Sequence, residues 1–285
     1  MKLLSYGLDY RMEPRLAFSL RGQAIDVMRA SLWMKEDRNA QDYLNLASSM
    51  KLALEDWPRC LSLLTQLEEV FQHVDTAGLT THNRLVAMPE DEIIFFAPIP
   101  DPPSVRFFNA FTNSSPQNYV FGQTQTLLGH NQELPTGGLS GRAELAAIVT
   151  TDKNGGQAEI AGFSIVNNWV DLKQWTQGYV GPALGQATSL GPYLLTSDEV
   201  ENLRIGAGLN MDLQVRIDGQ TQFDGRFKEM SFSFEDMLNA SHMTGVSAGD
   251  VLCSGSPQEQ DVITGQGKKM EIEVQALGTL TSRLV

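Results

Sequence analysis

From about Ser104 to the C-terminus, the sequence alternates short apolar segments with glycine and proline turns. Apolar runs of this length, rich in Val, Ile, Leu and Phe, are typical of strands between turns. We expect the clearest strands over residues 144–150, 159–166, 193–196, 213–217, 251–254 and 270–277. A helix over residues 233–240 interrupts them, and Asp218-Gly219 is predicted to form a hairpin turn. This half of the chain therefore predicts a strand-rich domain.

The first hundred residues have a different pattern. Residues 3–7, 15–20 and 24–27 predict strands, with a tight turn at Arg21-Gly22 between the last two. Apolar residues then recur at helical spacing over residues 40–55 and 58–73. Asn39 and Asp56 precede these two stretches, where a short polar side chain favours the start of a helix.

A proline-rich bend over residues 98–103 is the best candidate for a domain boundary. We therefore predict an α+β fold in two parts. A small N-terminal α+β lobe is expected over residues 1–98, and a strand-rich mixed β-roll of catalytic type over residues 104–285.

Charge and hydropathy exclude several classes of protein. The chain has 34 acidic and 21 basic side chains and a formal net charge of −13, which disfavours nucleic acid as a partner. No apolar run approaches the roughly 20 residues of a membrane-spanning helix, and the first residues do not resemble a signal peptide. We therefore expect a cytoplasmic protein with no membrane partner, in which Cys60 and Cys253 stay reduced.

Several strings resemble, in order and spacing, the motifs of the fumarylacetoacetate hydrolase superfamily. They are IPDPPSVR at 99–106, GRAELAAIV at 141–149, AGFSIVNNW at 161–169, SLGPYLLT at 189–196 and AGDVLCSGSP at 248–257. The resemblance implies the family's fold, with its small leading lobe and large strand-rich domain. It also implies a homodimer formed through the large domain.

The resemblance further implies a metal site that has lost most of its ligands. In the family, two glutamates of a Glu-x-Glu strand and an aspartate of an Asn-Asp pair hold Mg²⁺ or Ca²⁺. Here these positions read Arg142, Glu144 and Asn168. A hard cation needs several oxygen ligands. We therefore expect no metal cofactor.

Glu144, Arg142 and Asn168 are accordingly the predicted catalytic residues. Arg142 and Glu144 are two apart on a strand, so their side chains share one face, and we expect an ion pair there in place of the cation. Glu144 is expected to move a proton, with Arg142 and Asn168 as fixed hydrogen-bond donors. Asn168 has a simpler alternative role, which is to satisfy buried backbone groups.

Further residues are predicted to bind the substrate. They are Tyr119, Asn167, Trp169, Lys173, Gly255 and Ser256. The aromatic rings would stack on a planar ligand, Lys173 would replace a lost cation, and the turn at Gly255 would offer backbone N–H groups. Core packing is the alternative for the two rings, and a simple tight turn is the alternative for Gly255-Ser256.

The sequence leaves three functional hypotheses. The first is a divergent enzyme that acts on an oxo-acid or β-dicarbonyl ligand without metal, in a specialised biosynthetic step. The second is an inactive homologue that serves as a binding or structural subunit. The third is a metal-dependent hydrolase with a shifted ligand set that uses Glu133, Asp152 or Asp171.

Overall fold

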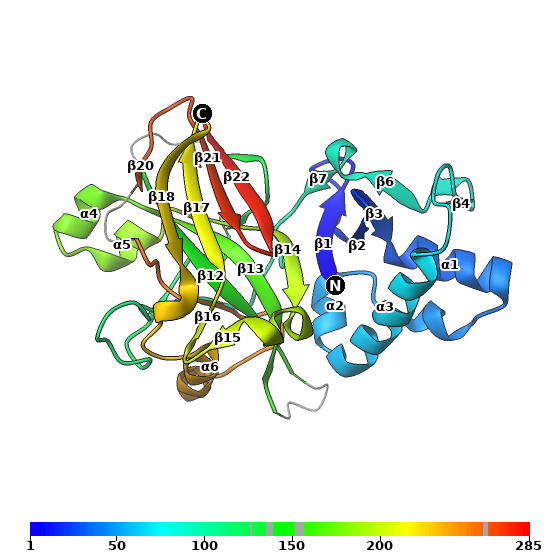
Figure 1. Ribbon diagram of the computed structural model, residues 1–285, viewed down its shortest axis with the longest axis horizontal. Coiled ribbons are helices and arrows are strands. Elements are labelled where there is room, and N and C mark those ends of the chain that lie inside the picture. The colour runs from blue at the N-terminus through cyan, green and yellow to red at the C-terminus, as the bar shows by residue number, and fades with distance from the viewer. Residues whose placement is uncertain (126, 135–138, 152–156, 259–261) are drawn as a thin grey trace.

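The computed structural model describes residues 1–125, 127–134, 139–151, 157–258 and 262–285. Figure 1 shows a smaller part that carries the N-terminus and helices α1 to α3, beside a larger part built mostly of long strands. The helices are α1 (Val27–Arg38), α2 (Met50–Leu54), α3 (Trp57–Phe71), α4 (Leu172–Thr176), α5 (Val180–Leu184) and α6 (Phe234–Ser241). Short 3₁₀ helices lie at Asp42–Asn45, Glu90–Glu92, Ser197–Leu203, Phe227–Glu229 and His242–Thr244.

The predicted N-terminal strands are confirmed as β1 (Lys2–Gly7), β2 (Arg15–Leu20) and β3 (Gln23–Asp26). Between β2 and β3, Arg21 and Gly22 have φ angles of 54° and 74°. Two successive positive φ angles define the two-residue turn that suits the twist of a hairpin.

The helices of the small lobe differ from the prediction. The helix expected over 58–73 is confirmed as α3, but the stretch 40–55 contains only a 3₁₀ turn and the short α2. The sequence pattern missed α1 because this helix buries polar Arg29 and Ser31 beside its apolar residues, which weakens the helical period. Asn39 ends α1 rather than starting a helix, with a φ angle of 54° and its N–H donating to the carbonyl of Met34.

Within the described residues, thirteen strands form one large sheet, whose main path is β6-β3-β2-β1-β14-β13-β12-β19-β8-β9, with β7, β10 and β20 paired at its side. The remaining bounds are β6 (Ala87–Pro89), β7 (Ile94–Phe95), β8 (Val105–Phe107), β9 (Val120–Phe121), β10 (Leu127–Leu128), β12 (Ser140–Thr150), β13 (Glu159–Val170), β14 (Ala187–Thr196), β19 (Val251–Cys253) and β20 (Val262–Ile263).

A second sheet of five strands has the order β11-β22-β21-β17-β18. Its strands are β11 (Gln132–Leu134), β17 (Asp212–Ile217), β18 (Gln220–Arg226), β21 (Lys269–Val274) and β22 (Gly278–Leu284). Two small pairs complete the described strands, β4 (Thr80–Thr81) with β5 (Arg84–Leu85) and β15 (Arg204–Ile205) with β16 (Gly208–Leu209). The predicted turn at Asp218-Gly219 joins β17 to β18.

The large sheet crosses the predicted domain boundary. β1 of the small lobe pairs antiparallel with β14 of the large part, with Leu3 opposite Leu194. One continuous apolar core contains residues of α1 and α3 together with residues of β12, β13 and β14. Because the two parts share a sheet and a core, the division into separate domains at residues 98–104 stays a prediction.

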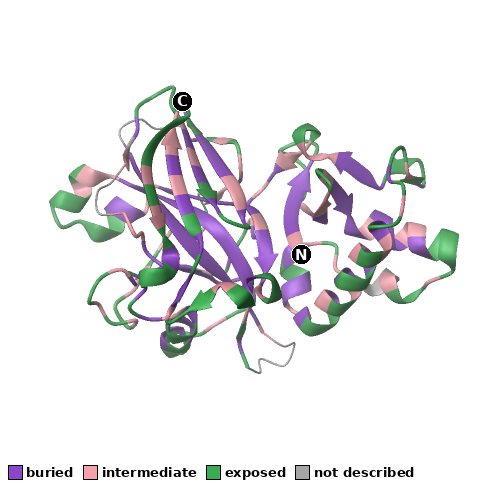
Figure 2. Ribbon diagram, in the orientation of Figure 1, coloured by how far each residue is buried: buried purple, intermediate pink, exposed green. Residues whose placement is uncertain are grey.

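The two central strands, β12 and β13, are buried along most of their length (Figure 2). Ala147 and its cross-strand partner Phe163 face the core that includes the second sheet. Ala146 and Ile148, one residue out of phase, face the core that includes the small lobe. Because both faces of these strands pack against apolar cores, their sequences are nearly continuous apolar runs rather than alternating apolar and polar residues.

Candidate active site

The pairing of β12 with β13 places the predicted catalytic residues on one face of the sheet. Arg142 lies directly opposite Asn168, and Glu144 lies two residues further along β12 on the same face. The intervening pair, Ala143 and Asn167, points to the other face. The three predicted catalytic side chains therefore gather where their spacing predicted.

The sheet opens beside these residues. β12 pairs with β19 at residues 146–148 and with β20 at residues 140–141, so residues 142–145 have no paired strand on this edge among the residues that the structure describes. Side chains take over the backbone pairing there: Leu145 N–H donates to Ser254 Oγ at 3.1 Å, and Ala143 N–H donates to Gln258 Oε1 at 2.7 Å. The backbone groups of β12 stay satisfied while a gap forms above Glu144.

A cavity of about 520 Å³ occupies this opening. This volume lies within the range of roughly 300–1,000 Å³ that is typical of small-molecule sites. Its polar lining includes Arg142, Glu144, Asn168, Ser256 and Gln258, and its aromatic lining consists of Phe107, Phe108, Phe111 and Trp175. Polar groups that converge within apolar walls are the usual arrangement of a binding site.

Glu144 is 2% exposed and is held by two donors. Asn168 Nδ2 donates to its Oε1 at 3.0 Å, and the Gly255 backbone N–H donates to its Oε2 at 3.0 Å. Burial raises the pKa of Glu144 to about 7, because the two hydrogen bonds and the charge of Arg142 only partly offset the loss of solvation. The carboxyl group is thus poised to exchange a proton near neutral pH.

Gly255 reaches Glu144 because it has no side chain. Its φ angle is 80°, and a Cβ atom at this position would lie 2.9 Å from the carbonyl oxygen of Phe108. A larger residue would be strained in this conformation and would push the turn away. The predicted role of Gly255 as a donor of backbone N–H is therefore visible, although the group it binds is Glu144.

Arg142 acts on Glu144 as a nearby charge. Its guanidinium carbon lies 4.7 Å from the centre of the Trp175 ring, which comes from α4. Stacking of this kind favours the cation and fixes the plane of the guanidinium. Among the described residues, the hydrogen bonds to Glu144 come from Asn168 and Gly255, so the expected close ion pair takes the form of a longer-range attraction.

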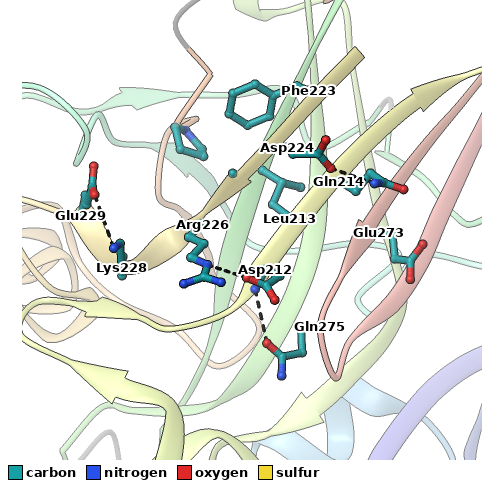
Figure 3. Close-up of a pocket in the computed structure, with 12 residues that line it drawn as sticks. Asp212, Leu213, Gln214, Phe223, Asp224, Arg226, Lys228, Glu229, Glu273 and Gln275 are labelled. Carbon is teal, nitrogen blue, oxygen red and sulfur yellow. Dashed lines mark hydrogen bonds and ion pairs between the residues drawn. The ribbon is translucent and has the colours of Figure 1, made fainter. Parts of the chain in front are cut away.

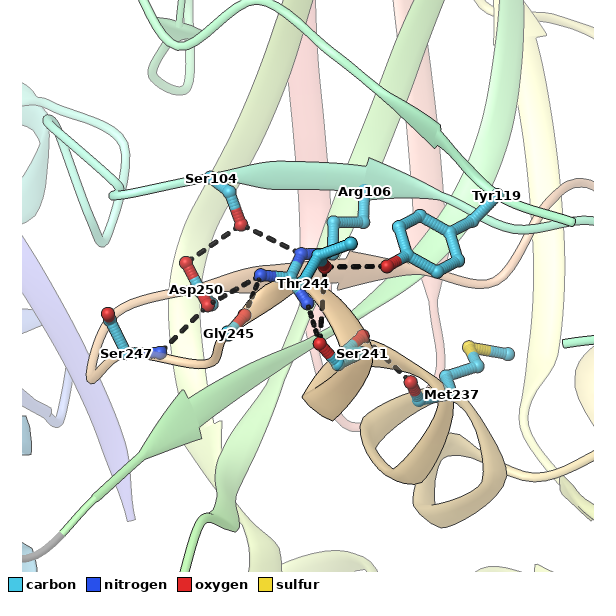
Figure 4. A network of polar contacts seen from close by, with 9 residues as sticks. All are labelled: Ser104, Arg106, Tyr119, Met237, Ser241, Thr244, Gly245, Ser247 and Asp250. Atoms are coloured by element: carbon cyan, nitrogen blue, oxygen red, sulfur yellow. Dashed lines mark hydrogen bonds and ion pairs between the residues drawn. The ribbon is translucent and has the colours of Figure 1, made fainter. Parts of the chain in front are cut away.

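A buried ion pair supports one wall of the cavity (Figure 4). Arg106 on β8 lies 3.2 Å from Asp250, just before β19, and both side chains are almost fully buried. The guanidinium also donates to the carbonyls of Ser241 and Gly245, and Ser104 Oγ donates to Asp250. The network joins β8 to β19, the parallel strands that lead into the cavity residues Phe107 and Gly255.

Another cavity, of about 900 Å³, lies against β17 and β18 (Figure 3). Its charged residues already pair with one another: Arg226 with Asp212 at 2.6 Å, and Lys228 with Glu229 at 3.8 Å. These side chains are exposed, so their charges are solvated. The smaller cavity is the candidate active site because it holds a buried carboxyl group with a raised pKa.

A family model for the C-terminal part of fumarylacetoacetate (FAA) hydrolase matches residues 106–285. The chain belongs to the fumarylacetoacetate hydrolase family. The matched segment includes β8, both central strands and the Gly255 turn, and therefore most of the cavity. The predicted family membership is confirmed.

Solved structures extend the likeness to the whole chain. Maleylpyruvate hydrolase from Sphingobium sp. SYK-6 has a TM-score of 0.71 and 15% identity, over 100% of this chain and 99% of that chain. Another structure of that enzyme holds manganese(II) and pyruvate. The 2-hydroxyhepta-2,4-diene-1,7-dioate isomerase from Mycobacterium marinum has a TM-score of 0.57 and 21% identity, over 72% of this chain and 82% of that chain. The predicted α+β fold of the family, which spans the whole chain, is thereby confirmed.

Sequence relatives are distant. An uncharacterised protein of Staphylococcus epidermidis is 23% identical over 133 residues, which make up 43% of this chain and 42% of that protein. The chain thus matches less than half of this relative's length.

Arg142, Glu144 and Asn168, the predicted counterparts of the family's metal ligands, do not fit a divalent cation in their chemistry. Glu144 is the one carboxylate among the three positions, and both of its oxygens accept hydrogen bonds. Asn168 turns its amide nitrogen toward Glu144, and Arg142 adds a positive charge. A hard cation requires several free oxygen ligands. Among the described residues, no group of three or more His, Cys, Asp or Glu side chains is arranged to hold a metal ion.

Two carboxylates of the alternative ligand set, Glu133 and Asp171, are not among the residues that line the cavity. Glu133 lies exposed on β11, and Asp171 caps α4 by accepting hydrogen bonds from the backbone N–H groups of Lys173 and Gln174. Asp152 lies outside the described residues.

The structure places four predicted substrate-binding residues outside the cavity lining. Trp169 is fully buried on the opposite face of β13, where its Nε1 donates to Ser189 Oγ at 3.0 Å. Asn167 points to the same opposite face, and its Nδ2 lies 3.3 Å from the sulfur of Met270. Both side chains point away from the cavity because neighbouring residues of a strand face opposite sides of the sheet, and their assignment as substrate-binding residues stays an untested prediction.

Tyr119 and Lys173 lie near the cavity without lining it. The Tyr119 hydroxyl lies 2.6 Å from Thr244 Oγ1, and its ring packs against Phe108. Lys173 is exposed on α4. Tyr119 therefore supports the wall that Phe108 forms, and packing, the simpler alternative, describes its position.

Sequence reasoning missed Gln258 and Trp175. Gln258 follows the Ser-Gly-Ser-Pro turn, and its position beside Ala143 depends on how that turn leaves the sheet. Trp175 lies in a segment between two strands, and only the folded structure brings it onto Arg142. In the structure Trp175 is a large aromatic residue that is 38% exposed, a feature that its sequence position does not reveal.

Proposed function

We propose that the protein is an enzyme of the fumarylacetoacetate hydrolase family that acts on an oxo-acid or β-dicarbonyl compound without a divalent metal. The reaction class is carbon–carbon bond cleavage or formation, isomerisation or cyclisation, as a step in specialised biosynthesis. The buried carboxyl group of Glu144, with its pKa of about 7 beside a guanidinium, is the observation that supports this proposal. The hydrolase and isomerase activities of the structural neighbours support the substrate class.

Each residue has a distinct task in the proposed reaction. Glu144 removes or returns a proton at the carbon next to a carbonyl group, which forms or collapses an enolate. Arg142 stabilises the negative charge that develops on the enolate oxygen, in a cavity lined in part by aromatic side chains. Asn168 Nδ2 donates its hydrogen bond to Glu144, so Asn168 orients the Glu144 carboxyl group rather than polarising the substrate.

Turnover of a panel of 2-oxo acids and acylpyruvates tests this function. Glu144→Gln should lower turnover by about two orders of magnitude or more, as the loss of a general base usually does. Glu133→Gln removes an exposed carboxylate on β11 and should leave turnover unchanged. A chelator should also leave it unchanged. Unimpaired turnover in Glu144→Gln, or complete loss with the chelator, would contradict the proposal.

A second candidate function is that of an inactive homologue that binds a ligand or a partner subunit. The presence of Arg142 at a position where the resemblance implies a glutamate favours it, because Arg142 lines the cavity. Binding of 2-oxo acids by calorimetry, together with no turnover of any of them, would select this candidate. For either function we propose a homodimer through the large domain, which sedimentation equilibrium would test.

A further inference from the structure

The five-stranded sheet ends in an open edge at β18. Among the described residues, β18 pairs with β17 on one side and with no strand on the other. The outer edge of such a strand carries backbone N–H and C=O groups that can pair with another strand. Proline and lysine often prevent this pairing, and β18 contains neither. The edge is therefore able to accept an added strand.

The second half of β18 is the regular part of this edge. The pairing with β17 shifts register at Gln222 and is then regular over residues 223–226. The cavity of about 900 Å³ lies against these same residues (Figure 3), so solvent reaches the strand there. An added strand would lie about 4.8 Å away, within the space beside this segment.

The charges of this segment identify the strand that would pair with it. Asp224 and Arg226 are two residues apart, so their side chains lie on one face of the sheet, and both are exposed. When two copies of the segment run antiparallel about a two-fold axis at Gly225, Asp224 of each copy lies opposite Arg226 of the other. Opposite charges in directly opposed positions stabilise a pair of strands, whereas like charges destabilise it. The segment is thus complementary to itself.

Both charged side chains can take a further partner. Arg226 Nε donates to Asp212 Oδ1 at 2.6 Å, and a guanidinium has further N–H donors on its two terminal nitrogens. Asp224 Oδ1 accepts from Gln214 Nε2 at 2.7 Å, and a carboxylate accepts several hydrogen bonds. Ion pairs across the axis would therefore add to these contacts rather than replace them.

Gly225 suits a position on the axis. A Cβ atom at Gly225 would lie 2.6 Å from a ring carbon of Phe223, so the Phe223 ring covers this glycine on the face opposite to the charges. Two opposed glycines bring no side chains between the strands. Because Phe223 is only half-buried, each copy also brings apolar ring surface to the axis.

The net charge of the chain makes local complementarity necessary. At −13, two copies repel each other in general, so a contact between them needs a place where opposite charges meet. Asp224 and Arg226 supply that place without adding net charge to the contact.

We propose that two copies of this chain associate through antiparallel pairing of their β18 strands, with Gly225 on the two-fold axis and an Asp224–Arg226 ion pair on each side of it. The two five-stranded sheets then form one continuous sheet across the dimer. This inference rests on the homodimer proposed above and adds the surface that forms it. Because one strand edge is smaller than a typical stable interface, we expect a dissociation constant of about 1–100 μM.

Charge exchange across the axis tests the pairing in the full chain. In Asp224→Arg, like charges would face each other on both sides of the axis, so the dissociation constant from sedimentation equilibrium should rise at least about tenfold. Arg226→Asp should have the same effect. The double variant Asp224→Arg/Arg226→Asp restores opposite charges and should return to within about threefold of the wild type. A wild-type constant in Asp224→Arg, or no recovery in the double variant, would overturn the inference.

The matched control lies on the other edge of the same sheet. Glu133 is exposed on β11, the edge strand at the far end of the strand order from β18. Glu133→Arg makes the same charge change as Asp224→Arg and should leave the dissociation constant unchanged. An equal weakening by both variants would show that net charge, rather than the β18 edge, controls association.

A disulfide tests the register. Opposed residues of antiparallel strands have Cα atoms about 4.5–5.5 Å apart, a separation that a disulfide spans. Oxidation of Asp224→Cys/Arg226→Cys should therefore give a covalent dimer on a non-reducing gel, whereas each single variant should stay monomeric because its thiol faces a charged side chain. The native Cys60 and Cys253 are buried. Equal cross-linking of the single and double variants would reject the register.

These outcomes separate the inference from the proposed function. A wild-type protein that stays monomeric up to about 300 μM would end both this inference and the proposed homodimer, whereas turnover that depends on Glu144 would be unaffected. A wild-type dimer that persists in Asp224→Arg would end this inference alone.

Discussion

At the scale of single residues, the proton on Glu144 determines the charge of the cavity. Among the described lining residues, Glu144 is the carboxylate and Arg142 the cation, so ionisation of Glu144 adds one negative charge to the cavity near Arg142. Burial opposes this ionisation, whereas Asn168, Gly255 and Arg142 favour it. The balance brings the pKa into the range where proton transfer is efficient.

The raised pKa of Glu144 predicts a pH dependence of stability. Its folded-state pKa of about 7 exceeds its ordinary value of 4.5. Its contribution is therefore fully present below about pH 4.5 and is lost as the pH rises to about 7, because the folded state holds the proton longer. The loss is on the order of 3 kcal/mol at most. Urea unfolding at a series of pH values should show this decline in the wild type but not in Glu144→Gln. Parallel curves for the two proteins would refute the prediction.

Restoring two carboxylates should restore a metal site. Arg142 and Asn168 face each other across β12 and β13, on the same face as Glu144. In the double variant Arg142→Glu/Asn168→Asp, three carboxylates would converge, the kind of ligand set that a hard cation prefers. Calorimetry with MnCl₂ should show binding by the double variant at least about a hundredfold tighter than by the wild type. Tight Mn²⁺ binding by the unmodified protein would show that its site still accepts a metal.

At the scale of secondary-structure elements, the contact between β8 and β19 supports the wall of the cavity. The two strands pair in parallel, and Arg106 and Asp250 join them through a buried network (Figure 4). The guanidinium has protein acceptors on several sides, which offsets the cost of burying its charge.

Removing Arg106 should be far more costly than removing an exposed arginine. Arg106→Met leaves Asp250 buried and uncompensated, and should lower the free energy of unfolding by about 3–5 kcal/mol. The matched control is Arg226→Met, whose partner Asp212 is exposed (Figure 3), with an expected cost below about 1 kcal/mol. Urea unfolding measures both. If both variants lowered the free energy of unfolding by similar amounts, burial would not determine how much each ion pair contributes to stability.

At the scale of the whole molecule, the small lobe and the large part share a sheet and a core. β1 covers the edge of β14, and the apolar core beneath the small lobe continues to β12 (Figure 1). A sheet edge without its neighbour exposes unpaired backbone groups.

The described helices include none long and apolar enough to cross a membrane.

We expect the two parts to unfold together. Trp33 and Trp57 report on the small lobe, whereas Trp169 and Trp175 report on the large part. In variants that keep only one pair, thermal unfolding followed by tryptophan fluorescence should have the same midpoint within about 2 °C, as a cooperative transition requires. Two separate midpoints would instead support independent domains at 1–98 and 104–285.

Local sequence patterns determined much of this protein. The turn at Arg21-Gly22, the strands of the large part and the shared face of Arg142 and Glu144 all follow from period and turn chemistry, which act over a few residues. The same alternation places the Trp169 side chain on the face of β13 opposite to that of Asn168, which argues against a binding site shared by the two residues. The helix α1 was hidden because its buried face is partly polar.

Tertiary structure decided the rest of the site. Gln258 contacts Ala143 because the turn that follows β19 brings its side chain to the edge of β12, and Trp175 contacts Arg142 because α4 lies beside the cavity. Both contacts join segments far apart in the chain, and no local period encodes which of them become neighbours. The sequence alone thus specified which residues share a face of a strand. The pairing of distant strands specified which residues lie opposite one another. The reason is that burial and backbone hydrogen bonding are satisfied only in the assembled sheet.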